Sequence, residues 1–205
     1  MKKLIEINSK NESYYKNSIM EIGKSLVINF RMTKELSPVF RNLLLYFTGN
    51  KCDYDLRKGI YLFGEYGIGK TITMRIFSLF LQQHFNFSGN NFGNTSVEKI
   101  AVHFKEIGNL NLYERNMDNG MQRPIKTCIN EFGKFLDEKH YGTSIQNVIN
   151  SMLMTRYELF QEGSVFTHST SNFKPNELNC FDDALIDRFK EMFNFIEIKG
   201  NSFRT

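Results

Sequence analysis

A length of 205 residues, with 41% hydrophobic and 23% charged residues, is that of one folded domain with a short appendage. No apolar run approaches the roughly 20 residues that span a bilayer, and the first residues lack the apolar core of a secretory signal. The three cysteines are widely spaced with no CxxC pair, and the four histidines are scattered, which disfavours disulfides and zinc sites. We therefore expect a cytoplasmic protein without a membrane partner.

Residues 1–50 form the basic part of the chain. They carry eight Lys or Arg against four Glu, a net charge of +4, which equals the net charge of the whole chain and leaves residues 51–205 neutral in sum. The stretches 11–30 and 38–48 have helical patterns of apolar residues. We predict a basic helical N-terminal segment over 1–50 and a nucleotide-binding core over 51–205. A nucleic acid partner and a simple solvated helix face both remain open for the basic segment.

Residues 64–71, GEYGIGKT, match the phosphate-binding template of Gly, four residues and Gly-Lys-Ser/Thr. Such a loop turns backbone N–H groups toward phosphates, while Lys70 adds positive charge and the Thr71 hydroxyl ligates Mg²⁺. An apolar run at 59–63 predicts a buried strand before the loop, and 72–81 predicts a buried helix after it. The predicted nucleotide-binding residues are Gly64, Glu65, Tyr66, Gly67, Ile68, Gly69, Lys70, Thr71 and Ile72.

The middle of the chain contains the second candidate element. Residues 86–96 are rich in Asn and Gly and predict a surface loop; 100–104 alternate as in a strand; 115–123 are expected to be irregular. The apolar run 125–129 predicts another strand, which ends at Asn130 and Glu131. At such a strand end an acidic pair usually holds Mg²⁺ through water and activates the attacking water. Glu131 is therefore the candidate base. Asn130 is a neutral candidate metal-site residue, whose amide can hydrogen-bond a metal-bound water.

The C-terminal third continues the alternation of helices and strands. We expect a helix at 147–160, a strand at 165–168, a helix at 184–192 and a last strand at 193–198. Asn172, which follows the strand that begins at residue 165, could touch the γ-phosphate or the attacking water. Together the elements predict an α/β fold with a parallel sheet covered by helices on both faces.

These segments together resemble the DnaC/IstB-type branch of the AAA+ ATPases, from about residue 38 to the end. The likeness is carried by KGIYLFGEYGIGKT (58–71), YGT (141–143), Asn147, RYELF (156–160), SN (171–172), LIDRFKEMF (185–193) and GNSFR (200–204). The resemblance implies a P-loop fold with ATP and Mg²⁺ as cofactors. It also implies Asn172 as sensor 1, Arg188 as an arginine finger acting on a neighbouring copy, and Arg204 as a second sensor.

Two positions depart from the family pattern. Asn130 stands where the branch has Asp, which bears on hydrolysis and Mg²⁺ affinity, and Ser171 stands where Thr is frequent. The sequence ends at Thr205, so we expect no helical C-terminal lid, as in this branch. The resemblance favours an ATPase that loads a replicative helicase on single-stranded DNA. The alternatives are a transposition helper ATPase that directs a transposase, and a hydrolysis-impaired module in which ATP only controls assembly.

Overall fold

The computed structural model describes residues 1–86, 88–118, 121–133, 139–140, 143–163, 167–178, 181, 183–200 and 202–203. Its helices are α1 (Glu12–Leu26), α2 (Leu36–Phe47), α3 (Lys70–His84), α4 (Val97–Ile107), α5 (Asn111–Glu114), α6 (Ile145–Gln161), the 3₁₀ turn η1 (Pro175–Glu177) and α7 (Asp183–Met192). Its strands are β1 (Gly59–Phe63), β2 (Gly93–Ser96), β3 (Arg115–Asp118), β4 (Met121–Pro124), β5 (Thr127–Phe132), β6 (Lys139–His140), β7 (Thr143–Ser144), β8 (Thr167–Ser171) and β9 (Phe193–Glu197).

The central sheet has five parallel strands in the order β2-β5-β8-β1-β9. Two antiparallel pairs, β3 with β4 and β6 with β7, lie outside it. In the parallel sheet every strand ends at the same edge, so the residues after β1, β5 and β8 are brought together there. The expected α/β fold with a parallel sheet is confirmed.

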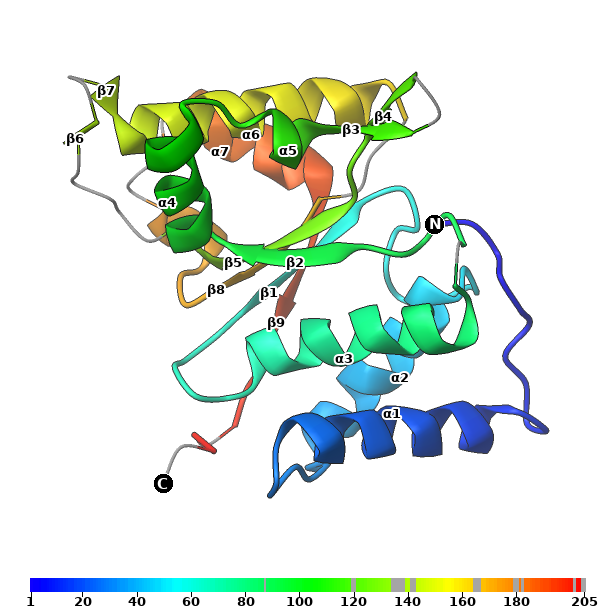
Figure 1. Ribbon diagram of the computed structural model, residues 1–205. Coiled ribbons are helices and arrows are strands. Elements are labelled where there is room, and N and C mark those ends of the chain that lie inside the picture. Colours follow the sequence, from blue (N-terminus) through cyan, green and yellow to red (C-terminus); the bar gives the residue numbers. More distant parts are fainter. Residues whose placement is uncertain are drawn as a thin grey trace.

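Helices cover both faces of this sheet. Figure 1 shows α1, α2 and α3 on one face and α4, α5, α6 and α7 on the other. Successive side chains of a strand point to opposite faces, and β1 follows this rule. Ile60 and Leu62 belong to the hydrophobic cluster with α1, α2 and α3, whereas Tyr61 between them belongs to the cluster with α4, α6 and α7.

The basic N-terminal segment packs against α3 on one face of the sheet. The rings of Tyr15 in α1 and Phe80 in α3 meet edge to face with centroids 5.8 Å apart. Before α1, the backbone N–H of Leu4 donates to the carbonyl of Thr48 at 2.9 Å. Side chains from both sides of residue 50 thus lie in one hydrophobic cluster. Among the described residues, no helix is both long enough and apolar enough to cross a membrane.

The prediction of a strand at 100–104 is wrong, because these residues lie in α4. Val97 and Ile100 are buried, and Phe104 packs against the same cluster, so the apolar spacing is that of a helix. The hydroxyl of Ser96 accepts the backbone N–H of Lys99 at 3.2 Å and caps the first turn.

Two further segments differ from the sequence interpretation. The loop predicted at 86–96 ends in β2, an edge strand that pairs with β5 in the central sheet. The stretch 115–123, expected to be irregular, contains most of the β3–β4 pair. The helix predicted at 11–30 ends at Leu26. The helices predicted at 147–160 and 184–192 and the strands at 59–63 and 193–198 are confirmed to within two residues. Of the strand predicted at 165–168, residues 165 and 166 lie outside the described residues, and β8 begins at Thr167.

Candidate nucleotide-binding site

The phosphate loop joins the end of β1 to the start of α3, as its sequence predicts. Gly64 has φ 143°, and a Cβ atom there would lie 2.4 Å from the carbonyl oxygen of Ile198, so only glycine fits. Gly69, with φ 90°, is the N-cap of α3 in the left-handed conformation that glycine tolerates. The loop therefore turns sharply and presents the N-terminus of α3, where free N–H groups and the helix dipole favour an anion.

Lys70 is held over this loop. Its side chain is 7% exposed, and its Nζ donates to the carbonyl oxygens of Gly64 at 2.8 Å and Glu65 at 2.6 Å. Of the other loop residues, Tyr66 is 67% exposed, whereas Ile68 is buried in the cluster with α2 and α3. The ammonium group is thus positioned by backbone oxygens at the place where phosphates would meet it.

Three polar side chains connect the loop to β5 and β8. The strand predicted at 125–129 is instead β5 at Thr127–Phe132, so Asn130 and Glu131 lie within the strand and do not follow it. The hydroxyls of Thr71 and Thr170 lie 3.4 Å apart, and Thr170 Oγ1 donates to Asn130 Oδ1 at 3.0 Å. Asn130 Nδ2 in turn donates to the carbonyl of Thr95 in β2 at 2.8 Å. Thr170 and Asn130 are both buried. The tertiary structure therefore brings the predicted Thr71 and Asn130 together through Thr170, a residue that the sequence interpretation missed.

Glu131, which follows Asn130 in the sequence, has an unusual backbone conformation. Between Ile129 and Phe132 the pairing of β5 with β8 shifts register, since three steps along β5 face two along β8. Within this bulge Glu131 has φ 59°, and it alone among the described non-glycine residues has positive φ. Its side chain is exposed, next to buried Asn130. Strained backbone of this kind is frequent at functional positions.

The residues present fit a Mg²⁺ ion poorly. Mg²⁺ in proteins is usually bound through one or two carboxylates together with substrate phosphates. Here the hydroxyl of Thr71 is available, but position 130 offers a neutral amide whose oxygen already accepts the hydroxyl of Thr170. Among the described residues there is no group of three or more His, Cys, Asp or Glu that could hold a metal ion.

The remaining candidate residues lie further along the chain. Asn172 follows β8 directly and is partly buried. Arg188 of α7 packs on α6: its Nη1 lies 2.7 Å from the sulfur of Met154, and its guanidinium carbon lies 5.4 Å from the ring centroid of Tyr157. Arg204 lies outside the described residues. The roles of Asn172, Arg188 and Arg204 stay predictions.

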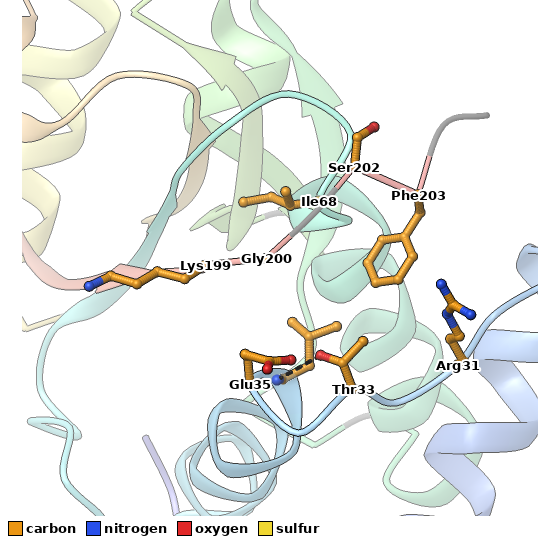
Figure 2. A pocket seen from close by; sticks show the side chains of 9 residues that line it. Arg31, Thr33, Glu35, Ile68, Lys199, Gly200, Ser202 and Phe203 are labelled. Carbon is orange, nitrogen blue, oxygen red and sulfur yellow. Dashed lines mark hydrogen bonds between the residues drawn. The ribbon is translucent and has the colours of Figure 1, made fainter.

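A pocket of about 260 Å³ adjoins the phosphate loop, and the sequence interpretation did not predict it. Its walls come from the segment before α2, from Ile68 and from the chain after β9. Figure 2 shows the Phe203 ring and Ile68 facing Thr33 and Glu35 across it, with the Lys199 side chain directed away. The backbone N–H of Phe203 donates to the carbonyl of Gly67 at 3.0 Å, which ties the C-terminal wall to the loop. The walls are mixed, with Leu36, Ile68 and Phe203 as their large apolar side chains.

Beneath the site, β8 carries a buried histidine. Burial lowers the pKa of His168 to about 3, with the charges of Lys126 and Arg156 as further causes. Its Nδ1 accepts the backbone N–H of Ile60 at 3.1 Å, so the ring is neutral and Nε2 carries the proton. Burial also raises the pKa of the Cys128 thiol on β5, which makes this cysteine unreactive.

No protein-family model matches the sequence, and no curated protein sequence matches it. Solved structures do resemble it. AMPPCP-bound DnaA from Aquifex aeolicus shares 17% identity with a TM-score of 0.57, over 86% of this chain and 50% of that one. A DnaC helicase loader shares 12% identity with a TM-score of 0.57, over 91% of this chain and 99% of that one. DnaI shares 17% identity with a TM-score of 0.53, over 87% of this chain and 93% of that one.

The extent of these matches differs. The chain spans about half the length of the DnaA structure and nearly the whole length of the DnaC structure. At identities of 12% to 17% the likeness concerns the fold. The chain therefore has the α/β fold of the DnaC-type AAA+ proteins, as its sequence resemblance implied.

Proposed function

We propose that this protein binds ATP and acts in DNA replication, where it loads a replicative helicase on single-stranded DNA with ATP hydrolysis. The observation that carries this proposal is the phosphate loop, in which Lys70 and the N-terminus of α3 face the edge of the sheet next to Asn130 and Glu131. The neighbours support it, since one was solved with AMPPCP and another is a helicase loader. A cytoplasmic site of action belongs to the same proposal.

The pocket beside the loop is our proposed site for the base. Ile68 and Phe203 supply apolar surfaces, and Thr33 and Glu35 supply polar atoms. Because the pocket adjoins the same loop that faces the phosphates, one nucleotide could occupy both. Mg²⁺ would arrive on the phosphates of the nucleotide, since this chain offers it the Thr71 hydroxyl and no carboxylate at position 130.

Contact with single-stranded DNA is proposed to be weak and sensitive to salt. Two cations of the basic segment already share one carboxylate: Glu12 Oε1 lies 2.6 Å from Lys16 Nζ and 2.9 Å from Arg41 Nε. These pairs reduce the charge left for phosphates. Electrostatic contact of this kind weakens steeply as the salt concentration rises.

Asn130 favours the hydrolysis-impaired module as a second candidate function. A neutral amide cannot replace the charge of a carboxylate near a metal and a polyphosphate. Turnover separates the two functions, because a loader that hydrolyses ATP releases phosphate and a binding module does not. A transposition helper is the third possibility, and the genes beside this one distinguish it, since a helicase gene favours loading and a transposase gene favours transposition.

Nucleotide binding is tested with a fluorescent ATP analogue titrated into the parent protein, Lys70→Ala and the control Lys51→Ala. Lys51 is an exposed lysine outside the loop, so its loss changes the net charge equally. Loss of a buried charge partner costs about 2–4 kcal/mol, so Lys70→Ala should weaken binding roughly 30- to 700-fold, with Lys51→Ala unchanged. Equal affinity of Lys70→Ala and the parent would refute the assignment of the loop.

A further inference from the structure

We propose that this site binds ATP without requiring Mg²⁺, because the neutral chain Thr71–Thr170–Asn130 stands where P-loop ATPases place a metal-binding carboxylate. The inference rests on the proposed nucleotide binding and concerns its dependence on a divalent cation.

The amide of Asn130 can adopt only one orientation. Its partner Thr95 presents a carbonyl oxygen, which accepts hydrogen bonds and cannot donate them, so the NH₂ group must face it at 2.8 Å. The amide oxygen therefore faces Thr170 Oγ1 at 3.0 Å. Asn130 is 6% exposed, so water does not substitute for these partners. The side chain ties β5 to β2 and to β8 and is a structural link between three strands.

The same contacts disfavour a carboxylate at this position. In Asn130→Asp one carboxylate oxygen would face the Thr95 carbonyl oxygen, and two acceptors repel each other at hydrogen-bond distance. The site is thus built around the amide, and the hydroxyls of Thr170 and Thr71 complete a neutral path to the loop.

The lack of a negative charge at position 130 changes the electrostatic interaction between the site and the phosphates. In a site with an acidic residue here, the carboxylate repels the phosphates until a divalent cation lies between them. An amide exerts no such repulsion, whereas Lys70 and the N-terminus of α3 attract the phosphates with or without a metal. The Glu131 carboxylate is present with or without a charge at position 130. Its side chain is exposed, so water weakens its repulsion of the phosphates relative to that of a buried carboxylate. The affinity for ATP should therefore depend little on Mg²⁺.

The test is a titration of the full-length protein with a fluorescent ATP analogue in buffer containing Mg²⁺ and in buffer containing EDTA. We expect the two dissociation constants to agree within about threefold, because the attraction comes from Lys70 and the helix terminus. Binding in Mg²⁺ with loss of binding in EDTA would overturn the inference and leave the proposed function intact. Absence of binding in both buffers would overturn the proposed function as well.

Two variants examine the cause. Asn130→Asp should bind roughly tenfold more weakly in EDTA than in Mg²⁺, because the new charge repels bare phosphates. The control Asn17→Asp adds the same charge at an exposed position of α1 and should behave as the parent. A folded Asn130→Asp that binds equally in both buffers would contradict the electrostatic argument.

If Asn130→Asp does not fold, the titrations of the parent protein in Mg²⁺ and in EDTA decide the inference by themselves, because they need no substitution in the site.

Discussion

Glu131 provides the sharpest test of how this site balances stability against function. Its φ of 59° places a residue with a long side chain in the left-handed region, inside the bulge of β5. For an L-amino acid other than glycine this conformation costs roughly 1–2 kcal/mol. Replacement by glycine removes that cost and adds about 0.5–1 kcal/mol of chain entropy in the unfolded state. The net expectation for Glu131→Gly is a gain of about 0.5–1 kcal/mol in the free energy of unfolding.

This gain can be measured by thermal unfolding. For a chain of this size 1 kcal/mol corresponds to roughly 2–4 °C, so Glu131→Gly should melt about 1–4 °C above the parent. Glu131→Gln keeps the strained backbone and should melt as the parent does. Both variants lack the carboxylate, so both should lose the ATP hydrolysis of the parent, by roughly 10²–10⁴-fold for a general base.

Two results would refute this reasoning separately. A lower melting temperature for Glu131→Gly would show that the conformation at residue 131 is not strained. Hydrolysis at the parent rate by Glu131→Gln would remove Glu131 as the base. A parent without turnover would support the hydrolysis-impaired alternative, and the melting temperatures would still test the strain.

Three other predictions follow from buried or surface charges. Arg156 is fully buried and donates to Thr167 Oγ1 at 2.7 Å and to the carbonyl of Ile125 at 2.8 Å. Arg156→Lys should therefore lower the free energy of unfolding, measured in urea titrations, by about 3 kcal/mol. A loss below about 1 kcal/mol would contradict this role. The pKa of His168 is lowered from 6.5 in the unfolded chain to about 3 in the folded protein. Between pH 6.5 and about 3 the unfolded chain therefore carries a proton on this ring that the folded protein lacks. The free energy of unfolding should fall as the pH drops through this range, by up to about 1.4 kcal/mol per pH unit. His168→Asn should remove that slope, and parallel loss of stability in both proteins would speak against it. Arg188→Ala and Lys70→Ala, each inactive alone, should recover ATPase activity when mixed if Arg188 acts on a neighbouring copy. No recovery in a mixture shown by sedimentation to co-assemble would confine Arg188 to its own subunit.

The phosphate loop is the part of the site that the sequence determines by itself. Its glycines, Lys70 and Thr71 are contiguous, and the apolar run before it and the helix after it are local as well. Interactions over a few residues therefore suffice to define strand, loop and helix in that order. The alternation of later helices and strands likewise predicts a parallel sheet, because each element has a clear length and apolar pattern.

The interval around residue 100 shows where local patterns compete. Ile100, Val102 and Phe104 alternate as in a strand, while Val97, Ile100 and Phe104 recur as in a helix. The helix forms because Ser96 caps it and because its apolar face packs on the sheet, whereas Val102 is 52% exposed. Burial against a neighbouring layer thus decided between two readings that the sequence permits equally.

Only the tertiary structure decided the rest of the site. The hydroxyls of Thr71 and Thr170 meet although the two residues are 99 positions apart in the sequence, and the sequence predicts Asn172 as the site residue of this segment. The pocket is formed by Thr33 and Phe203, which lie near opposite ends of the chain. The spacing of residues in the sequence does not predict such contacts. They form when parallel strands end at one edge of the sheet and distant segments pack beside that edge.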